Sequence, residues 1–308
     1  MIDRRSLIAA LAAASLPGMA RAQPAPERLP LWPQEPPGGG DGPSGPLATS
    51  EAGAISNIAR PFLEIFAPAQ PNGTAVLIAA GGGYRRIAVG REAYPAALWL
   101  NQQGVTAFVL TYRLPREGWA AGPLAPLQDA QRALRLVRAE AGRRQLDRKR
   151  VGSLGFSAGG HLLGMASVRS AFRSYPAGDA VDDASARPDF TALLYPVITL
   201  EPPYQHTSTC RELVGPDADP AASAEWSVQT HVRGNCPPMF LAQADDDRIS
   251  DPANTRLLAE ACSGEGVPVE WDRFESGGHG FAMGRPGTPT EAWPGRYRDW
   301  MVRLGVLA

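Results

Sequence analysis

The segment Gly155-Phe156-Ser157-Ala158-Gly159 decides how the rest of this chain is interpreted. An apolar run from Val151 to Leu154 precedes it, and a helix-like stretch from Gly160 to Ala166 follows it. A G-x-S-x-G motif between a strand and a helix is typical of a turn so tight that only glycine fits beside the serine. We therefore expect Ser157 to have a strained backbone, with its hydroxyl held clear of the sheet near the positive end of the following helix.

On both sides of this motif, apolar and β-branched runs alternate with amphipathic stretches. Pro126 and Pro252 suit the first turns of helices, and Asp251 is a ready N-cap. The expected strands cover residues 75–80, 105–111, 150–155, 190–196, 238–243 and 267–273, and the expected helices cover 91–103, 126–141, 157–168, 252–263 and 290–304. This alternation predicts an α/β protein with a mostly parallel sheet and helices on both faces.

Segment 197–236 breaks the alternation because it is long, proline-rich and aromatic. We interpret it as an insertion over the active-site edge of the sheet and not as a second domain. Its aromatic residues Tyr204 and Trp226, together with Tyr84 and Trp119 from other loops, are candidates for substrate contacts, because aromatic faces stack on sugar rings. For each of them, simple packing of the loops onto the core is the alternative.

The N-terminus has the pattern of an export signal. Arg4 and Arg5 precede an apolar run, Leu7 to Leu16, that is too short to cross a bilayer, and Ala20-Arg21-Ala22 provides small residues for a signal peptidase. A buried N-terminal helix is the alternative, but the run has no polar face. The expected organisation is a twin-arginine-like signal peptide over residues 1–22 with cleavage before Gln23, an extended Pro/Gly-rich arm over 23–50 and one catalytic domain over 51–308. The mature protein is then expected in the periplasm or outside the cell, with no membrane span.

Charge and cysteine content exclude several other classes of protein. The formal net charge is −1, which gives no field to attract nucleic acid, and the basic segment 143–150 is expected to be a solvated turn. The three cysteines have no metal-ligand spacing, so we expect no metal. In an oxidising compartment a Cys210–Cys236 disulfide is the pairing to test first, with three separate thiols, Cys262 included, as the alternative.

A serine hydroxyl needs a base to become a nucleophile, and His279 is the best candidate among four histidines. His161 lies only four residues beyond Ser157 on the same helix, so we expect it to pack or hydrogen-bond beneath the turn. His206 and His231 lie in the insertion, ahead of any candidate acid. In proteins with a G-x-S-x-G turn between a strand and a helix, the catalytic residues follow one another as serine, acid and then histidine. The glycine-rich loop after the last expected strand, which contains His279, is therefore the expected place for the base.

The acid is expected directly after the strand at 238–244, where Asp245, Asp246 and Asp247 follow one another. We favour Asp246 because it stands three residues before Ile249, a small aliphatic residue expected to re-enter the core. Asp245 and Asp247 would then cap nearby backbone or face solvent. The role of the acid is to hold the histidine tautomer and to stabilise its protonated form.

An oxyanion hole is expected from backbone amides at two places. One donor is the N–H of Ala158, the residue after the nucleophile, and the others are the amides of Gly82 and Gly83 in the loop after the strand at 75–80. The Tyr84 amide is a further candidate. Without side chains, these glycines allow neighbouring N–H groups to converge on one oxygen.

Taken together, these motifs resemble those of bacterial exported acetylxylan-esterase-like α/β hydrolases, described as esterase/lipase family proteins. The resemblance extends from about residue 29 to 305, and Ala80 departs from it, since relatives often have Pro or His there. The segments that carry it are Leu31-Trp32-Pro33, Gly81-Gly82-Gly83-Tyr84, Thr111-Tyr112-Arg113-Leu114-Pro115, Gly155 to His161, Arg187-Pro188-Asp189-Phe190, Tyr195-Pro196-Val197 and Gly277-Gly278-His279-Gly280-Phe281.

The resemblance implies an α/β-hydrolase fold and hydrolysis of acetyl or other short acyl esters, on a small molecule or a plant cell-wall polysaccharide, without metal or cofactor. Two other functions are weighed against it. A prolyl-oligopeptidase-like peptidase would match Asp246-Asp247-Arg248, but such enzymes have a large additional domain. A non-catalytic sugar-binding relative would lack one of the three catalytic residues, and none is missing here.

Overall fold

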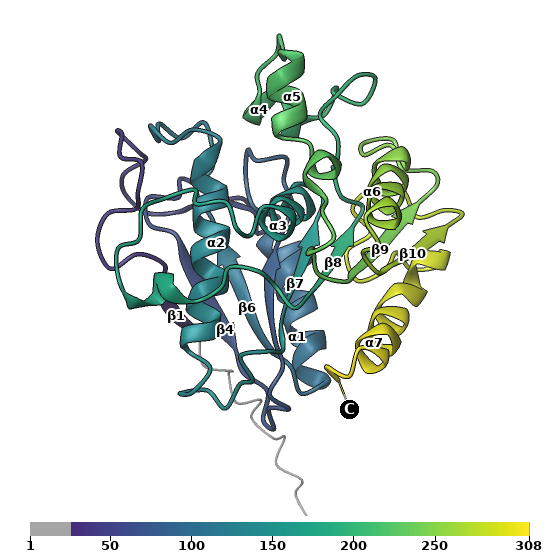
Figure 1. Cartoon of the computed structure of the whole chain (residues 1–308), viewed down its shortest axis with the longest axis horizontal. Helices are drawn as coiled ribbons and strands as arrows, with labels where there is room; N and C mark the ends of the chain where they lie inside the picture. Colours follow the sequence, from purple (N-terminus) through teal and green to yellow (C-terminus); the bar gives the residue numbers. More distant parts are fainter. Residues whose placement is uncertain (1–25, 308) are drawn as a thin grey trace, which may run out of the picture.

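The computed structural model describes residues 26–307, which contain one large mixed sheet and a two-stranded ribbon. The large sheet has the strand order β1-β4-β6-β5-β7-β8-β9-β10, and the run from β6 to β10 is parallel throughout (Figure 1). At the other edge β4 is antiparallel to β6, and β1 is antiparallel to β4. The strands are β1 (Glu27–Pro30), β4 (Phe62–Phe66), β5 (Ala75–Ala79), β6 (Thr106–Thr111), β7 (Val151–Phe156), β8 (Phe190–Leu194), β9 (Met239–Ala244) and β10 (Val269–Phe274), with β2 (Ala48–Thr49) and β3 (Ile55–Ser56) in the ribbon.

Helices cover both faces of this sheet. On one face α2 packs against α3, and on the other α1 and α7 meet where Trp99 contacts Trp293 and Tyr297 (Figure 1). The predicted mostly parallel sheet with helices on both faces is therefore confirmed. The helices are α1 (Tyr94–Gln102), α2 (Leu124–Ala139), α3 (Ala158–Val168), α4 (Ser208–Leu213), α5 (Pro220–Glu225), α6 (Ala253–Gly264) and α7 (Trp293–Arg303), with short helical turns at Val89–Ala93, Ala180–Asp183, Val228–His231 and Pro289–Ala292.

Two strands at the antiparallel edge, β1 and β4, were not among the expected ones. β1 lies within the segment 23–50 that was expected to be irregular. In β4 the middle residue is Glu64, which is buried and accepts hydrogen bonds from Arg28 of β1 at 3.0 Å and from the Tyr94 hydroxyl at 2.6 Å. A charged residue in mid-strand hides the apolar pattern, and only the partner strand shows how its charge is satisfied.

The segment 197–236 lies over the edge of the sheet where the site is found. It contains α4 and α5, which project beyond the sheet in Figure 1. The hydroxyl of Ser208, the first residue of α4, donates to the carbonyl oxygen of Gly83 at 3.1 Å. The predicted insertion over the active-site edge is therefore confirmed, and it contacts the glycine-rich loop directly.

The three cysteines are free and buried, so the structure does not form the Cys210–Cys236 disulfide. The Cys210 thiol donates to the carbonyl oxygen of Leu200, and Cys262 contacts Met239. Burial raises the pKa of the Cys262 thiol to about 12. Three separate thiols, the alternative in the sequence-based interpretation, is the arrangement found.

The predicted signal peptide lies outside the described residues. Across residues 26–307, no helix has the length and apolar character needed to cross a membrane.

Candidate active site

The turn between β7 and α3 holds Ser157 in a strained backbone conformation. Its φ and ψ angles are 52° and −118°, a region that non-glycine residues rarely occupy. A Cβ atom on Gly155 would lie 2.5 Å from the carbonyl oxygen of Gly159, and one on Gly159 would lie 2.2 Å from that of Ala79. Both glycines are therefore required by close backbone approach, and Ser157 stands at the N-terminus of α3 with 8% of its surface exposed.

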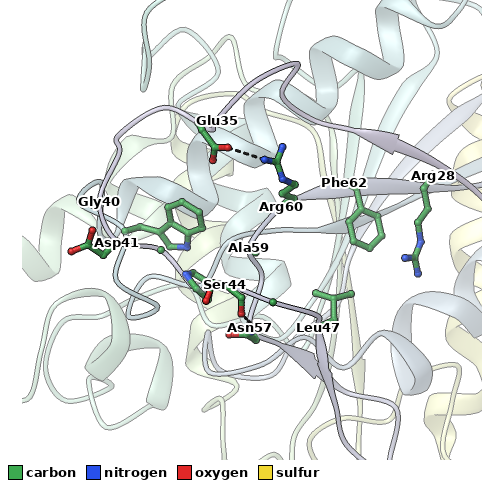
Figure 2. A pocket seen from close by; sticks show the side chains of 14 residues that line it. Arg28, Glu35, Gly40, Asp41, Ser44, Leu47, Asn57, Ala59, Arg60 and Phe62 are labelled. Atoms are coloured by element: carbon green, nitrogen blue, oxygen red, sulfur yellow. Dashed lines mark hydrogen bonds and ion pairs between the residues drawn. The ribbon is translucent and has the colours of Figure 1, made fainter.

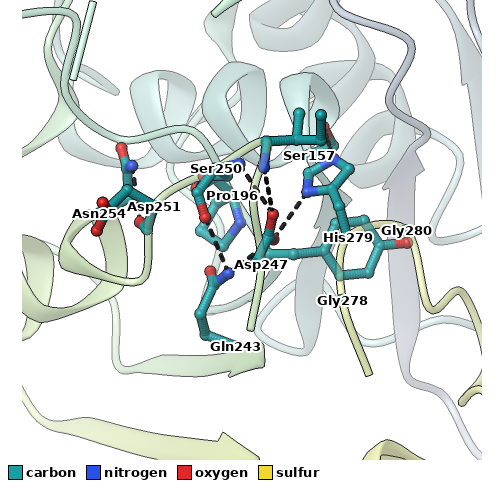
Figure 3. A network of polar contacts seen from close by, with 12 residues as sticks. Ser157, Pro196, Gln243, Asp247, Ser250, Asp251, Asn254, Gly278, His279 and Gly280 are labelled. Atoms are coloured by element: carbon teal, nitrogen blue, oxygen red, sulfur yellow. Dashed lines mark hydrogen bonds and ion pairs between the residues drawn. The ribbon is translucent and has the colours of Figure 1, made fainter. Parts of the chain in front are cut away.

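Ser157, His279 and Asp247 form a line of hydrogen bonds across three separate loops. The Ser157 Oγ lies 2.9 Å from His279 Nε2, and His279 Nδ1 lies 2.8 Å from Asp247 Oδ2 (Figure 3). The imidazole side chain is 19% exposed and the Asp247 side chain is fully buried. With Nδ1–H donating to the carboxylate, Nε2 is free to accept the proton of the serine hydroxyl.

The acid in this line is Asp247, so the choice of Asp246 from the sequence is wrong. That choice assumed that Ile249 re-enters the core, but Ile249 is 62% exposed. Instead, the backbone N–H groups of Ile249 and Ser250 donate to Asp247 Oδ1 at 2.8 and 3.0 Å, and Gln243 Nε2 donates to Oδ2 at 2.8 Å. These donors turn the Asp247 carboxylate inward, where it meets the His279 ring.

Asp246 lies on the outside of the same turn and supports the histidine loop from its backbone. Its Oδ1 accepts the N–H of Gly278 at 2.7 Å, and this hydrogen bond holds the pKa of Asp246 below its usual value. The third acid, Asp245, forms an exposed ion pair with Arg273 at 2.9 Å. Of the three adjacent carboxylates, one contacts the His279 ring, one contacts the loop backbone and one faces solvent.

Two further side chains fasten the acid loop to the start of the insertion. Ser250 Oγ donates to the carbonyl oxygen of Pro196 at 2.6 Å. Asn254 Oδ1 accepts the N–H groups of Ile198 and Thr199 at 2.7 and 3.0 Å. Figure 3 shows Ser250 and Pro196 between Asn254 and Asp247. The loop after β9 is thus fixed by the neighbouring strand end, not by its own sequence alone.

The loop after β5 lies against Ser157, since a Cβ on Gly81 would be 2.7 Å from the Ser157 Cβ. Gly82 and Gly83 have φ angles of 127° and 64°. A Cβ on Gly82 would collide with Arg86, and one on Gly83 would collide with Ser208. Over the described residues, the N–H groups of Gly82 and Gly83 have no protein acceptor, whereas the N–H of Gly81 donates to Glu92 at 2.6 Å. The N–H groups of Gly82 and Gly83, with that of Ala158 at the first turn of α3, are the donors expected from the sequence, and their role as an oxyanion hole stays a prediction.

Tyr84 and His161 pack together beneath this loop. The Tyr84 side chain is buried, with its hydroxyl 2.9 Å from His161 Nδ1, while His161 Nε2 donates to the carbonyl oxygen of Trp226 at 2.7 Å. Burial lowers the pKa of His161 to about 4, so it is neutral near pH 7. His161 therefore lies beneath the turn as expected, but the Tyr84 side chain is a support for the loop and not the substrate contact that was expected.

The other three expected substrate contacts lie in two places, Trp119 beside the N-terminal arm and Tyr204 and Trp226 in the insertion. Trp119 is 8% exposed and its ring is covered by Gly42 on the arm, with the Arg113 guanidinium 5.0 Å from the ring centroid. It lines a cavity of about 560 Å³ beside β4, where Arg60 and Glu35 form an ion pair (Figure 2). That cavity has no lining residue in common with the Ser157 site. Tyr204 and Trp226 are half-buried in the insertion, and their role as substrate contacts stays a prediction.

Two buried residues next to the site, Glu92 and Tyr195, were not predicted from the sequence. Glu92 contacts both the glycine loop and the Tyr195 hydroxyl, and the Tyr195 ring packs against the His279 ring. Tyr195 belongs to one of the motifs that carried the resemblance, but no spacing along the chain connects it to Glu92. Only the order of strands in the sheet brings the two together.

Two curated proteins are similar to this chain in sequence. The acetylxylan esterase of Xylanibacter ruminicola is 31% identical over 234 residues, which cover 75% of this chain and 45% of that protein. The endo-1,4-beta-xylanase B of Butyrivibrio fibrisolvens is 31% identical over 214 residues, which cover 68% of this chain and 32% of that protein. The chain thus spans about half and about a third of the length of these curated relatives.

A solved structure matches almost end to end. The acetyl ester-xyloside bifunctional hydrolase from Caldicellulosiruptor lactoaceticus is 31% identical with a TM-score of 0.76, covering 92% of this chain and 98% of that one. The sheet and helices therefore form an α/β-hydrolase fold. The BD-FAE family model matches residues 63–262, more than half of the chain. The chain belongs to the BD-FAE family.

Proposed function

We propose that this protein is a serine esterase that hydrolyses short acyl esters, most of all acetyl groups on a polysaccharide such as xylan. The observation that carries the proposal is the hydrogen-bonded line from Ser157 through His279 to Asp247, next to the free amides of Gly82 and Gly83. The geometry supports acyl transfer in general. The acetyl group and the xylan backbone are suggested by the names of two relatives at 31% identity.

In the first half of the proposed reaction, Ser157 becomes acylated. His279 Nε2 removes the proton from the Ser157 hydroxyl as Oγ attacks the ester carbonyl carbon. The carbonyl oxygen becomes an oxyanion, which the N–H groups of Gly82, Gly83 and Ala158 stabilise. When the tetrahedral intermediate collapses, the protonated His279 gives its proton to the departing alcohol oxygen, and the acyl group remains on Ser157.

In the second half, water takes the place of the alcohol. His279 accepts a proton from water, whose oxygen attacks the acyl carbon, and the same amides stabilise the second oxyanion. Collapse returns the proton to Ser157 Oγ and releases the carboxylic acid. Asp247 stays ionised throughout, holds the Nδ1–H tautomer and stabilises the imidazolium in each half.

The proposed function also implies a location outside the cytoplasm. We propose that residues 1–22 direct export and are removed before Gln23, which places the enzyme with an external polysaccharide. The chemistry described needs no metal or cofactor, since protein groups supply the nucleophile, the base and the oxyanion donors.

Hydrolysis of p-nitrophenyl esters and of acetylated xylan by the purified protein tests the proposal. We expect turnover of the acetyl ester, release of acetate from the polysaccharide and weaker activity on the eight-carbon ester. Ser157→Ala and His279→Ala are each expected to lower kcat by about 10⁴-fold or more, and combining them adds little because they act as a unit. Retention of a tenth of the activity by Ser157→Ala, or cleavage of peptide p-nitroanilides in preference to esters, would overturn it.

A further inference from the structure

A buried carboxyl group, that of Glu92, lies between the glycine-rich loop and the histidine loop. Glu92 belongs to the helical turn Val89–Ala93 and is 5% exposed. Its Oε2 accepts the N–H of Gly81 at 2.6 Å, and its Oε1 accepts the Tyr195 hydroxyl at 3.0 Å. The Tyr195 hydroxyl in turn accepts the N–H of Ala282 at 3.2 Å. A continuous chain of hydrogen bonds therefore links the two loops that serve Ser157 from opposite sides.

On the oxyanion side, Glu92 fixes the peptide that precedes the two free amides. A Cβ on Gly81 would lie 2.7 Å from the Ser157 Cβ and 3.2 Å from Glu92 Oε2, so nucleophile, loop and carboxyl group are in close contact. The Gly81 N–H is held by Glu92. This hydrogen bond therefore helps to fix the orientation of the next two peptides, which carry the N–H groups of Gly82 and Gly83. A shift of these donors of even 1 Å would weaken their hydrogen bonds to an oxyanion.

On the histidine side, Glu92 acts through Tyr195. The Tyr195 ring lies edge-on to the His279 ring with centroids 5.0 Å apart, and edge-on to Phe281 at 4.5 Å. Tyr195 has a φ angle of 37°, a strained value for a residue with a side chain. The hydrogen bond to Glu92 holds this tyrosine in place, and the tyrosine forms one wall against which the imidazole rests.

The hydrogen bonds around Glu92 suit an ionised carboxylate. Both partners donate to it, from the Gly81 amide and the Tyr195 hydroxyl. Burial raises the pKa of Glu92, while these two hydrogen bonds and the nearby His279 and Arg91 oppose that rise.

We propose that Glu92 is a positioning residue that couples the oxyanion loop to the His279 loop, so that oxyanion stabilisation and base orientation depend on one buried carboxylate. The inference rests on the proposed esterase activity and deepens it. Glu92 does not touch the reacting atoms. It acts through the Gly81 peptide on one side and through Tyr195 on the other.

The test compares Glu92→Gln, Tyr195→Phe and Glu64→Gln with the wild-type protein on p-nitrophenyl acetate. Glutamine keeps the shape of Glu92 but has one acceptor oxygen in place of two, so either the Gly81 N–H or the Tyr195 hydroxyl faces its NH₂ group and loses its acceptor. Glu64 is the matched control because it is also a buried carboxylate that accepts a tyrosine hydroxyl, on β4 at the antiparallel edge. Thermal unfolding of each variant establishes that folded protein is compared.

We expect Glu92→Gln to lower kcat by about 10²-fold with KM changed less than about threefold, the pattern of a lost transition-state interaction. Tyr195→Phe, which keeps the carboxylate, is expected to lose about tenfold in kcat. The inhibition constant of a small alkylboronic acid, whose tetrahedral adduct on Ser157 places an oxygen among the same amides, should rise in parallel with the loss of kcat. Glu64→Gln should keep kcat within about twofold of wild type even though its unfolding temperature falls.

A kcat for Glu92→Gln within about threefold of the wild-type value would overturn the inference, as would a loss of kcat with unchanged boronic acid inhibition. If Glu92→Gln does not fold, Tyr195→Phe decides, and wild-type kcat and boronic acid inhibition in that variant would contradict the coupling. A wild-type protein without esterase activity would be a failure of the proposed function itself, which is a separate result.

Discussion

The turn at Ser157 and the loop at Asp247 meet at the same histidine, but they are specified in different ways. At the turn, close backbone approach requires both glycines, with Gly155 against the turn itself and Gly159 against Ala79, and the motif from Gly155 to Gly159 is enough to identify it. At the acid loop, three adjacent aspartates are chemically equivalent in the sequence. Donors on Gln243, Ile249 and Ser250 select Asp247, and the difference shows that local sterics can be read from sequence more easily than a choice among equal side chains.

Replacing each aspartate by asparagine tests the acid loop with the largest expected effect. Asp247→Asn should lower kcat by about 10³- to 10⁴-fold, because the amide favours the wrong histidine tautomer. Asp246→Asn, which still accepts the Gly278 N–H, should lose less than about tenfold, and Asp245→Asn should lose little. Steady-state kinetics on p-nitrophenyl acetate distinguish them. Greater sensitivity at Asp246 would restore the sequence-based choice and contradict the geometry.

Replacing a glycine tests whether sterics define the turn. In Gly159→Ala the new methyl group would lie 2.2 Å from the carbonyl oxygen of Ala79, so the strand or helix must move, at a cost of about 3 kcal/mol or more in the free energy of unfolding. Gly295→Ala in α7 is the matched control, because no atom lies within 4 Å of its added Cβ, and it should stabilise by about 0.5–1 kcal/mol. Urea denaturation measures both. Equal stability of the two variants would mean that the turn tolerates a side chain.

The histidine beneath the turn gives a smaller, pH-dependent effect. The pKa of His161 is lowered from 6.5 to about 4 by burial, so the unfolded chain binds a proton at a higher pH than the folded one. The folded state therefore loses up to about 3 kcal/mol as pH falls from about 6.5 to about 4, and the contribution is fully present above that window. His161→Gln should remove this part of the pH dependence, whereas His206→Gln in the insertion should not. Unfolding curves of both variants that match the wild-type pH dependence would contradict a buried neutral His161.

Much of the fold was accessible from the sequence because the five inner parallel strands, β5 to β9, are buried and appear as largely apolar runs. β4 was missed because Glu64 interrupts its pattern, and its charge is satisfied by Arg28 from β1. Strand pairing of this kind is a long-range contact that hydrophobic periodicity does not reveal.

Part of the site was accessible from the sequence as well, for a different reason. Ser157 and His279, located from motif and chain order, lie 2.9 Å apart between Oγ and Nε2. Asp247 was missed because the exposure of Ile249 depends on how the loop meets Pro196 and the insertion. Glu92 and Tyr195, about a hundred positions apart, meet only through the order of strands in the sheet.

Covalent labelling with diethyl p-nitrophenyl phosphate tests whether Ser157 is the activated nucleophile, because this organophosphate esterifies an activated serine much faster than other hydroxyl groups and releases p-nitrophenol. We predict one diethylphosphoryl group per chain, found by peptide mass spectrometry on Ser157, with ester hydrolysis lost in proportion to labelling. Asp247→Asn should label far more slowly than Asp246→Asn. A label on any other residue, or full loss of ester hydrolysis while Ser157 stays unmodified, would contradict the assignment of Ser157, His279 and Asp247 as the catalytic group.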